Sequence, residues 1–159
     1  KCGIRDEWQI IPSQKLSDAL FIRRNHLYPK LIINEADAYT TDTMHRVNIK
    51  KDVSLDALVA SYYNSLSFAF AEISGRSHGG GVLELMPSEV ENIMLPYHDS
   101  NKNLVETIDK MIRANESIDK ILEITNKKIL IENYGFTEKE VQIADRIWKK
   151  LSNRRLNRN

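Results

Sequence analysis

The sequence contains few of the residues and segments that mark a secreted, membrane-bound or metal-dependent protein. Its single cysteine, Cys2, excludes an internal disulfide framework and a zinc site built from cysteines. No apolar run is long enough for a transmembrane helix, and residues 1–8 lack the apolar core of a signal peptide. We therefore expect a cytoplasmic protein with no membrane partner.

Neither sign of charge dominates the chain. The 23 basic and 22 acidic side chains give a formal net charge of +1, so the total charge does not indicate a nucleic-acid partner. From residue 149 onward, however, the chain has five basic residues and no carboxylate: Lys149, Lys150, Arg154, Arg155 and Arg158. Such a tail is typical either of a solvated helix end, where cations suit the helix dipole, or of a phosphate contact.

The four histidines provide no recognisable metal-binding pattern. They stand far apart, without a His-Glu-x-x-His pair or a tight carboxylate cluster. Ser77 precedes His78, but adjacent side chains rarely point at each other, and no third group is implied that would orient the histidine. Glu138-Lys139-Glu140 superficially suits a nuclease, but a helix-capping pattern already explains it. We expect no catalytic residue and no metal site.

Glycine is scarce too, yet four of the six glycines lie within one stretch of seven residues, Gly75-Arg76-Ser77-His78-Gly79-Gly80-Gly81. Closely spaced glycines permit positive φ and close approach to a partner, and Arg76 adds a fixed charge. This combination suits contact with an anion or a phosphate. The alternative is a tight turn with a helix-capping glycine at Gly75, which one glycine would satisfy.

The expected order of elements around these glycines argues against a cofactor-binding loop. Dinucleotide-binding and similar loops follow a strand and open a helix, whose N-terminus faces the ligand. Here a helix is predicted before the glycines, and a strand after them at residues 82–86. The spacing also differs from the Gly-x-x-x-x-Gly-Lys-Ser/Thr pattern. We expect no cofactor to bind this chain.

The first third of the chain is predicted to form short strands. Alternating or β-branched residues indicate extended segments at residues 7–11, 17–24, 30–34 and 43–50. Pro29 favours an extended conformation for Tyr28, and residues 35–42 are polar and turn-like. Several short strands in succession indicate a curved antiparallel sheet.

One long, largely buried helix is predicted from Ser54, a good N-cap residue, to about Ile73. Its apolar side chains follow helical spacing: Leu55, Leu58, Val59, Tyr62, Tyr63, Leu66, Phe70 and Ile73. The aromatic residues could instead form a base-stacking platform, but at helical spacing they are typical of a core. We therefore expect Phe70 to be buried.

Helices are predicted to dominate the rest of the chain. A capping box of Ser88 and Glu91 indicates a short helix to about Met94, and the polar residues 98–103 are predicted to form a linker. Three helices follow, at about residues 104–113, 117–133 and 137–151. The last should begin with a capping box of Thr137 and Glu140, and should bury Ile143, Ile147, Trp148 and Leu151. The residues after it are expected to be disordered.

The glycine-rich stretch continues as Val82-Leu83-Glu84-Leu85-Met86-Pro87-Ser88-Glu89. The whole segment resembles a motif in the C-terminal region of adenine-N6 DNA methyltransferases from bacterial restriction–modification systems. In that family an aromatic residue usually stands where this chain has His78. The resemblance extends back through residues 62–70, 40–46 and 28–34, so it covers roughly residues 20–97, and long matches in fixed order are specific.

This resemblance implies that the full protein transfers a methyl group from SAM to adenine N6 in a specific double-stranded site. It also implies that a separate N-terminal domain performs the chemistry. The catalytic Asn/Asp-Pro-Pro-aromatic motif is missing here, because the four prolines stand apart at Pro12, Pro29, Pro87 and Pro96. We expect a C-terminal fragment, catalytically silent by itself, with SAM bound only in the full-length enzyme.

DNA recognition remains as the hypothesis for this chain. Basic groups at strand ends and loops, with nearby hydroxyl and imidazole groups, could contact phosphates and base edges. The candidate DNA-binding residues are Arg23, Arg24, Lys30, Thr41, Thr43, His45, Arg46, Arg76, Ser77, His78, Gly79, Gly80 and Gly81. As alternatives, residues 40–43 could form an Asx or Ser/Thr turn, Asp42 could pair with Arg46, and Arg76 could pair with Glu72 or Glu84.

The sequence thus predicts an α+β fold. Short irregular antiparallel strands should pack on a central helix within residues 1–98, and a C-terminal helical part should occupy residues 99–159. The predicted function is a DNA target-recognition domain, with double-stranded DNA and a catalytic methyltransferase domain as partners. One alternative is a protein-interaction module whose helices from Leu104 onward dock a cognate endonuclease or the catalytic domain. Another is a nuclease, which metal-dependent DNA cleavage would reveal.

Overall fold

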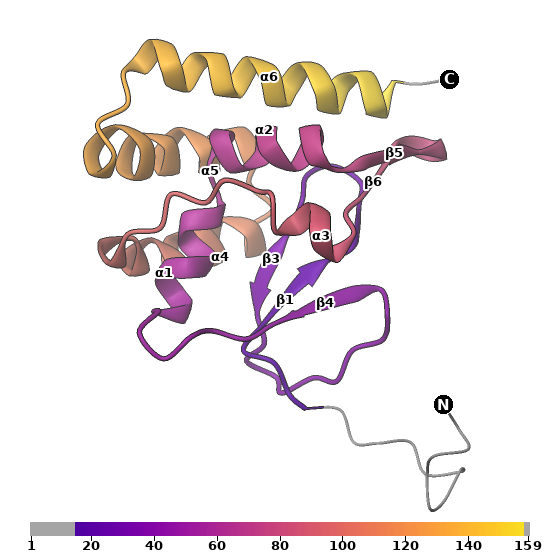
Figure 1. Ribbon diagram of the computed structural model, residues 1–159. Coiled ribbons are helices and arrows are strands. Elements are labelled where there is room, and N and C mark those ends of the chain that lie inside the picture. Colours follow the sequence, from indigo (N-terminus) through magenta and orange to yellow (C-terminus); the bar gives the residue numbers. More distant parts are fainter. Residues whose placement is uncertain (1–14, 158–159) are drawn as a thin grey trace, which may run out of the picture.

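The computed structural model, which describes residues 15–157, has the predicted α+β architecture, with two small antiparallel sheets beside a layer of helices (Figure 1). The first sheet has the order β3-β1-β4. Its strands are β1 (Ala19–Ile22), β3 (Leu31–Ile33) and β4 (Met44–Val47). The second sheet has the order β2-β6-β5, with strands β2 (Arg24–Asn25), β5 (Arg76–His78) and β6 (Val82–Glu84). The strand expected at residues 7–11 lies outside the described residues.

The long helix expected from Ser54 is two helices, α1 (Leu55–Tyr62) and α2 (Ser65–Ser74). Ser54 caps α1 as predicted, because its hydroxyl accepts the N–H of Ala57. Asn64 interrupts the helix with extended backbone (φ −153°, ψ 160°), and its side-chain oxygen accepts the N–H of Ser67 at 2.9 Å. A short polar side chain that bonds its own backbone in this way ends one helix and begins the next.

The break changes which aromatic residues are buried. Phe68 is completely buried, whereas Phe70 is only partly buried and Ile73 is 60% exposed. The expectation that Phe70 belongs to the core is therefore wrong, because the helical spacing does not continue through Asn64, where a new helix begins. Tyr62 and Tyr63 are buried, so the core interpretation of these rings is confirmed over a base-stacking platform.

A cluster of aromatic rings forms the centre of the core. Tyr62 lies between Phe21 of β1 and Phe68 of α2, with ring centroids 5.5 and 5.7 Å apart. Trp148, far along the chain, packs edge-on against Phe68 with a centroid distance of 5.4 Å. The same core includes Ile108 and Ile121, so helices on both sides of residue 98 contribute to it. The division of the chain into two regions there stays a prediction.

The segment after β6 differs in detail from the expectation. Helix α3 (Pro87–Val90) is shorter than expected, and the Glu89 carboxylate, not that of Glu91, accepts a backbone N–H ahead of the helix, from Met86 at 2.8 Å. Most of the linker predicted at residues 98–103 instead belongs to a 3-10 helix (Asp99–Leu104) that packs on α1. Its buried Asn101 donates a hydrogen bond to the Ser61 hydroxyl at 2.8 Å, which explains why this polar segment is folded against the protein.

The C-terminal helices are α4 (Val105–Arg113), α5 (Ile118–Thr125), which continues as a π-helix (Asn126–Asn133), and α6 (Glu138–Leu156). Ser117 caps α5, and Thr137 and Glu140 form the predicted capping box at the start of α6. Helix α6 lies along α2 (Figure 1). None of the described helices is both long and apolar enough to span a membrane.

Helix α6 buries only part of the predicted face. Trp148 is buried as predicted, whereas Ile143 and Ile147 are 40% and 39% exposed and Leu151 is partly buried. The other buried residues of α6 are Val141, Ala144, Ser152 and Arg155. The contacts of this buried face with α2 include Trp148 against Phe68 and the ion pair of Arg155 with Glu72. The helix also continues through residues expected to be disordered, up to Leu156.

Candidate nucleic-acid interface

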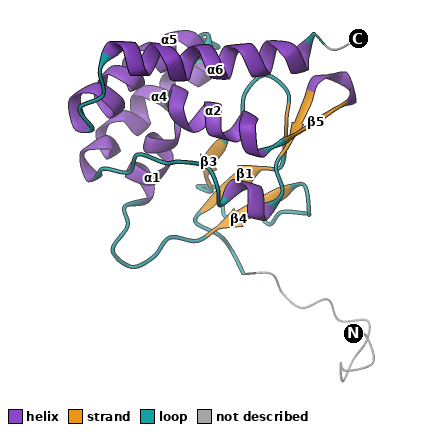
Figure 2. Cartoon of the chain, turned by 45° about the horizontal axis from the view of Figure 1, so that its top comes forward, coloured by secondary structure: helices purple, strands orange, loops and turns teal. Residues whose placement is uncertain are grey.

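The glycine-rich stretch forms the turn of a β-hairpin. Strands β5 and β6 pair antiparallel, with His78 opposite Val82, and Gly79–Gly81 joins them as a single 3-10 turn. Gly80 and Gly81 have φ of 71° and 72°, a conformation that favours glycine. The hairpin projects beyond the end of α2, close to the C-terminal end of α6 (Figure 1 and Figure 2).

The predicted helix before the glycine turn and the predicted strand after it are present as α2 and β6, but the sequence did not predict β5, which lies between α2 and the turn. Arg-Ser-His has no β-branched or alternating apolar residues that would indicate a strand. Gly75 ends α2 with φ −80°, so it is not a left-handed cap. A Cβ at Gly75 would lie 2.6 Å from Leu83 Cδ1, and one at Gly81 would lie 3.2 Å from Leu156 Cα. Packing and turn geometry thus account for these two glycines, whereas a Cβ at Gly79 would meet no atom within 4 Å.

The second sheet carries a row of charged side chains across its three strands. Arg24 of β2 and Arg76 of β5 both stand opposite Glu84 of the central strand β6. Residues opposite each other in antiparallel strands point to the same face. His78, two residues beyond Arg76, shares that face, so the register brings one carboxylate and three nitrogen-bearing side chains together.

Glu84 is the centre of this charged group. Its Oε1 lies 3.0 Å from Arg23 Nη2 and 3.1 Å from Arg24 Nε, and its Oε2 lies 2.6 Å from His78 Nε2. The Glu84 side chain is only 8% exposed, while that of Arg24 is 62% exposed. The hydrogen bond from Arg24 holds the pKa of Glu84 below its ordinary value, helped by His78 and the charge of Arg23 and opposed by burial.

Arg76 is held by a different carboxylate from the two expected. Its Nε donates to Glu89 Oε1 at 2.7 Å, and neither Glu72 nor Glu84 is its ion-pair partner. The hydrogen bond from the Met86 N–H, and then that from Arg76, lower the pKa of Glu89. The Arg76 side chain remains 64% exposed, so the ion pair orients the guanidinium while leaving it open to solvent.

A pocket of about 380 Å³ adjoins Arg23 on the side of β4 and collects further predicted residues. Among the residues lining it are Arg23, Thr41, His45 and Arg46. The Thr43 N–H donates to Thr41 Oγ1 at 3.5 Å, which agrees with the Ser/Thr-turn interpretation of this loop. His45 Nε2 lies 2.6 Å from the carbonyl oxygen of Leu85, so this ring joins the two sheets. Among the described residues, no ion pair connects Asp42 with Arg46.

Two predicted residues lie apart from these groups. Lys30 extends over the ring of Tyr28, with its Nζ 5.1 Å from the centroid. Ser77 stands opposite Leu83, on the other face of β5 from Arg76 and His78. Glu84 orients His78, which the sequence did not imply. Because Ser77 and His78 point to opposite faces of β5, His78 cannot serve as the base for this serine.

Residues 1–130 of the chain match the family model described as the C-terminal domain of Type II methyltransferase M.Eco57I. The chain belongs to this family. Neither a curated protein nor a solved structure matches the chain.

Membership of the M.Eco57I C-terminal family confirms the resemblance to restriction–modification DNA methyltransferases. The matched residues include both the hairpin and the pocket beside Arg23. The glycine turn does not fit a SAM-binding loop, since it leads into β6 and no helix N-terminus follows it. Within residues 15–157, no group of three or more potential ligands is arranged to hold a metal ion.

In this member of the M.Eco57I C-terminal family, the carboxylates that organise the site were not predicted from the sequence. Glu84 stands between Leu83 and Leu85 in an apolar run, and a carboxylate at such a position signals a buried ion pair. In the basic tail, Arg155 is also an ion-pair residue. Its Nη2 lies 2.7 Å from Glu72 Oε1, and its Nη1 donates to the carbonyl groups of His26 and Gly81. Arg155 is thus buried and ties α6 to α2 and to the hairpin turn.

Proposed function

We propose that this chain is the DNA target-recognition domain of a SAM-dependent adenine-N6 DNA methyltransferase. A separate N-terminal domain would bind SAM and transfer the methyl group. The observation that carries the proposal is the row of Arg24, Arg76 and His78 on one exposed face of the hairpin sheet, held by Glu84 and Glu89. The adenine and SAM assignments rest on the motif resemblance described above.

The ion pairs in this row favour recognition because they fix the cations without using all their donors. A guanidinium has five N–H donors in a rigid fork. The hydrogen bonds of Arg24 and Arg76 to Glu84 and Glu89 each use Nε, and both side chains are well exposed. Their terminal nitrogens can therefore meet a phosphate or a guanine edge in a geometry set in advance.

The pocket beside Arg23 would supply a second set of contacts. Arg46 and Thr41 are exposed, and Arg23 borders this pocket while also contacting Glu84. A duplex lying over Arg23 would meet the arginine row on one side and the Thr41 loop on the other. In such an arrangement the arginines position the backbone, and the loop hydroxyls and Arg46 reach base edges.

Two titrations of the isolated chain test this proposal. Fluorescence anisotropy with random-sequence duplex DNA should give an affinity that falls steeply as the salt concentration rises. Calorimetric titration with SAM should give no saturable heat, since no SAM-binding loop is expected here. If the chain binds no duplex at low salt, or binds SAM stoichiometrically, the proposal that this chain binds DNA while a separate domain binds SAM is contradicted.

A further inference from the structure

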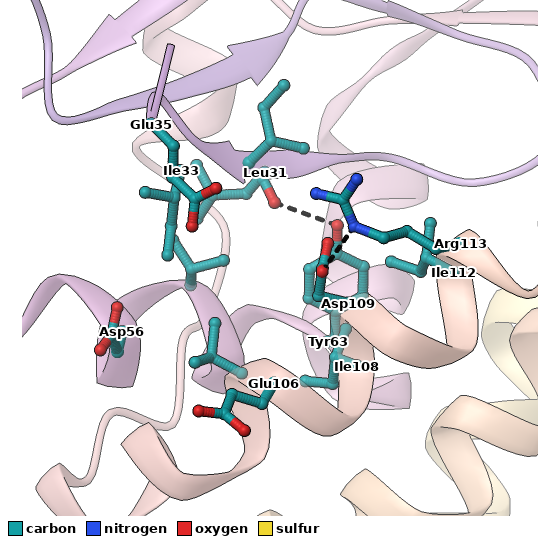
Figure 3. A pocket seen from close by; sticks show the side chains of 13 residues that line it. Leu31, Ile33, Glu35, Asp56, Tyr63, Glu106, Ile108, Asp109, Ile112 and Arg113 are labelled. Atoms are coloured by element: carbon teal, nitrogen blue, oxygen red, sulfur yellow. Dashed lines mark hydrogen bonds and ion pairs between the residues drawn. The ribbon is translucent and has the colours of Figure 1, made fainter. Parts of the chain in front are cut away.

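A second surface, away from the arginine row, has the opposite charge. A groove of about 480 Å³ lies between β3, α1 and α4 (Figure 3). Its floor is apolar: Val59 and Ile108 are buried there, and Ile33 and Ile112 are partly buried beside them. The Tyr63 hydroxyl donates to the Leu31 carbonyl at 3.0 Å and fixes one wall.

Carboxylates surround this floor. Glu35 follows β3, Asp56 lies in the first turn of α1, and Glu106 and Asp109 lie on α4 (Figure 3). The one cation among the lining residues, Arg113, is paired with Asp109 through an Nε–Oδ2 distance of 2.6 Å. Four carboxylates and one guanidinium leave the lining with a net charge of −3.

This charge decides which class of partner can approach. Phosphate groups of DNA or of an anionic membrane would be repelled by a rim of net negative charge. The rim charges are also spread over three elements, so one compact cation could not meet them all. An extended partner with several separated cations and apolar side chains between them would meet both the rim and the floor.

We propose that this groove docks a cationic amphipathic segment of a partner protein. Apolar side chains of that segment would cover Ile33, Val59 and Ile112, while its Lys or Arg side chains would pair with Glu35, Asp56 and Glu106. Within α4, Lys110 Nζ lies 3.6 Å from Glu106 Oε2, and both side chains are largely exposed. Such a pair is weak, so a cation of the partner can replace Lys110 beside Glu106. The docking site is independent of DNA binding.

A designed peptide provides the probe. A fluorescein-labelled 18-residue Leu/Lys amphipathic helix should bind the 159-residue chain, and its affinity should weaken as salt is raised. The same peptide with Glu in place of Lys should not bind. Amide chemical-shift changes on binding should cluster at residues 31–35, at the start of α1 and on α4.

Matched variants locate the contact. Glu35→Gln/Glu106→Gln should weaken peptide binding roughly five- to thirtyfold, the scale expected for two partly exposed charge pairs. The control, Glu91→Gln/Glu123→Gln, removes two exposed carboxylates outside the groove lining and should change affinity less than about twofold. Both variants should melt like the parent, because all four side chains are exposed.

Four results would overturn the proposal. The groove and control variants could weaken binding equally, the Glu peptide could bind as well as the Lys peptide, or the shift changes could fall on the hairpin. Binding of hexylammonium as tight as that of the peptide would also overturn it, because the groove would then be a small-ligand site. None of these results depends on whether the chain binds DNA.

Discussion

Glu84 is the residue on which the geometry of the proposed interface most depends. It is a carboxylate in an apolar strand, and it contacts Arg23, Arg24 and His78 at 2.6–3.1 Å. A negative charge on a DNA-binding surface would ordinarily oppose phosphate. Here its contacts hold three cationic or potentially cationic groups in one place, so its positioning effect should exceed its repulsion.

Replacing this carboxylate separates the two effects. Glu84→Gln removes a negative charge, yet we expect duplex affinity to fall by at least roughly threefold, because a neutral amide cannot hold the same three groups. Glu91→Gln, which removes an exposed carboxylate nearby in the sequence, should leave affinity equal or slightly higher. Stronger DNA binding by Glu84→Gln would show that the carboxylate only repels.

The same residue makes stability depend on pH. The pKa of Glu84 is lower in the folded protein than its ordinary value of 4.5, mainly because of the hydrogen bond from Arg24. Its contribution is therefore fully present above pH 4.5 and is lost as the pH falls through the lowered folded pKa. Urea unfolding between pH 6 and pH 3 should show a smaller loss of stability for Glu84→Gln than for the parent. Identical profiles would show that the ion pairs do not stabilise the fold.

Adjacent arginines at the end of α6 allow another matched comparison. Arg155 and its partner Glu72 have side chains only 2% and 3% exposed, whereas Arg154 is exposed. Arg155→Ala should lower the free energy of unfolding by about 3–5 kcal/mol, since Glu72 would remain buried without its partner. Arg154→Ala should change it by less than about 0.5 kcal/mol. Equal melting temperatures for the two variants would contradict the assignment of Arg155 as a buried tie.

At the scale of elements, local signals predicted where helices begin better than where they break. Ser54 and Thr137 cap their helices as predicted, and Ser117 caps the helix predicted to begin there, because a cap depends on neighbouring residues alone. The break before α2 also depends on a distant residue. The Ser65 N–H donates to the side chain of Asn126 at 2.8 Å, a contact 61 positions along the chain that no local pattern contains.

The break predicts losses of different size for two phenylalanines that are two positions apart. Phe68→Ala should lower the free energy of unfolding by about 3–5 kcal/mol, because Phe68 is fully buried among Tyr62, Tyr63 and Trp148. Phe70→Ala should cost clearly less, since Phe70 is only partly buried. Chemical unfolding of both variants measures the difference. A larger loss for Phe70→Ala would support the uninterrupted helix.

At the scale of the molecule, the sequence predicted the α+β class and most of the basic residues that the structure brings together. Arg23, Arg24, Arg76 and His78 were all predicted as DNA-binding residues, although β2 and the β5–β6 hairpin, which bring them into one place, lie far apart in the chain. The carboxylates that hold them were missed, because pairing across a sheet depends on register. The separation of charge into a basic hairpin face and an acidic groove was equally hidden, since the net charge is only +1.

The salt dependence of DNA binding tests the central claim most directly. The test variant is Arg24→Gln/Arg76→Gln. The control variant, Arg113→Gln/Arg146→Gln, removes two exposed arginines from α4 and α6. Duplex affinity should be followed over a range of salt concentrations, with melting as a control for folding. We predict that the first variant lowers the slope of log affinity against log salt by about 2, and that the second leaves it unchanged. Equal slopes for both variants and the parent would remove the hairpin face from the DNA interface.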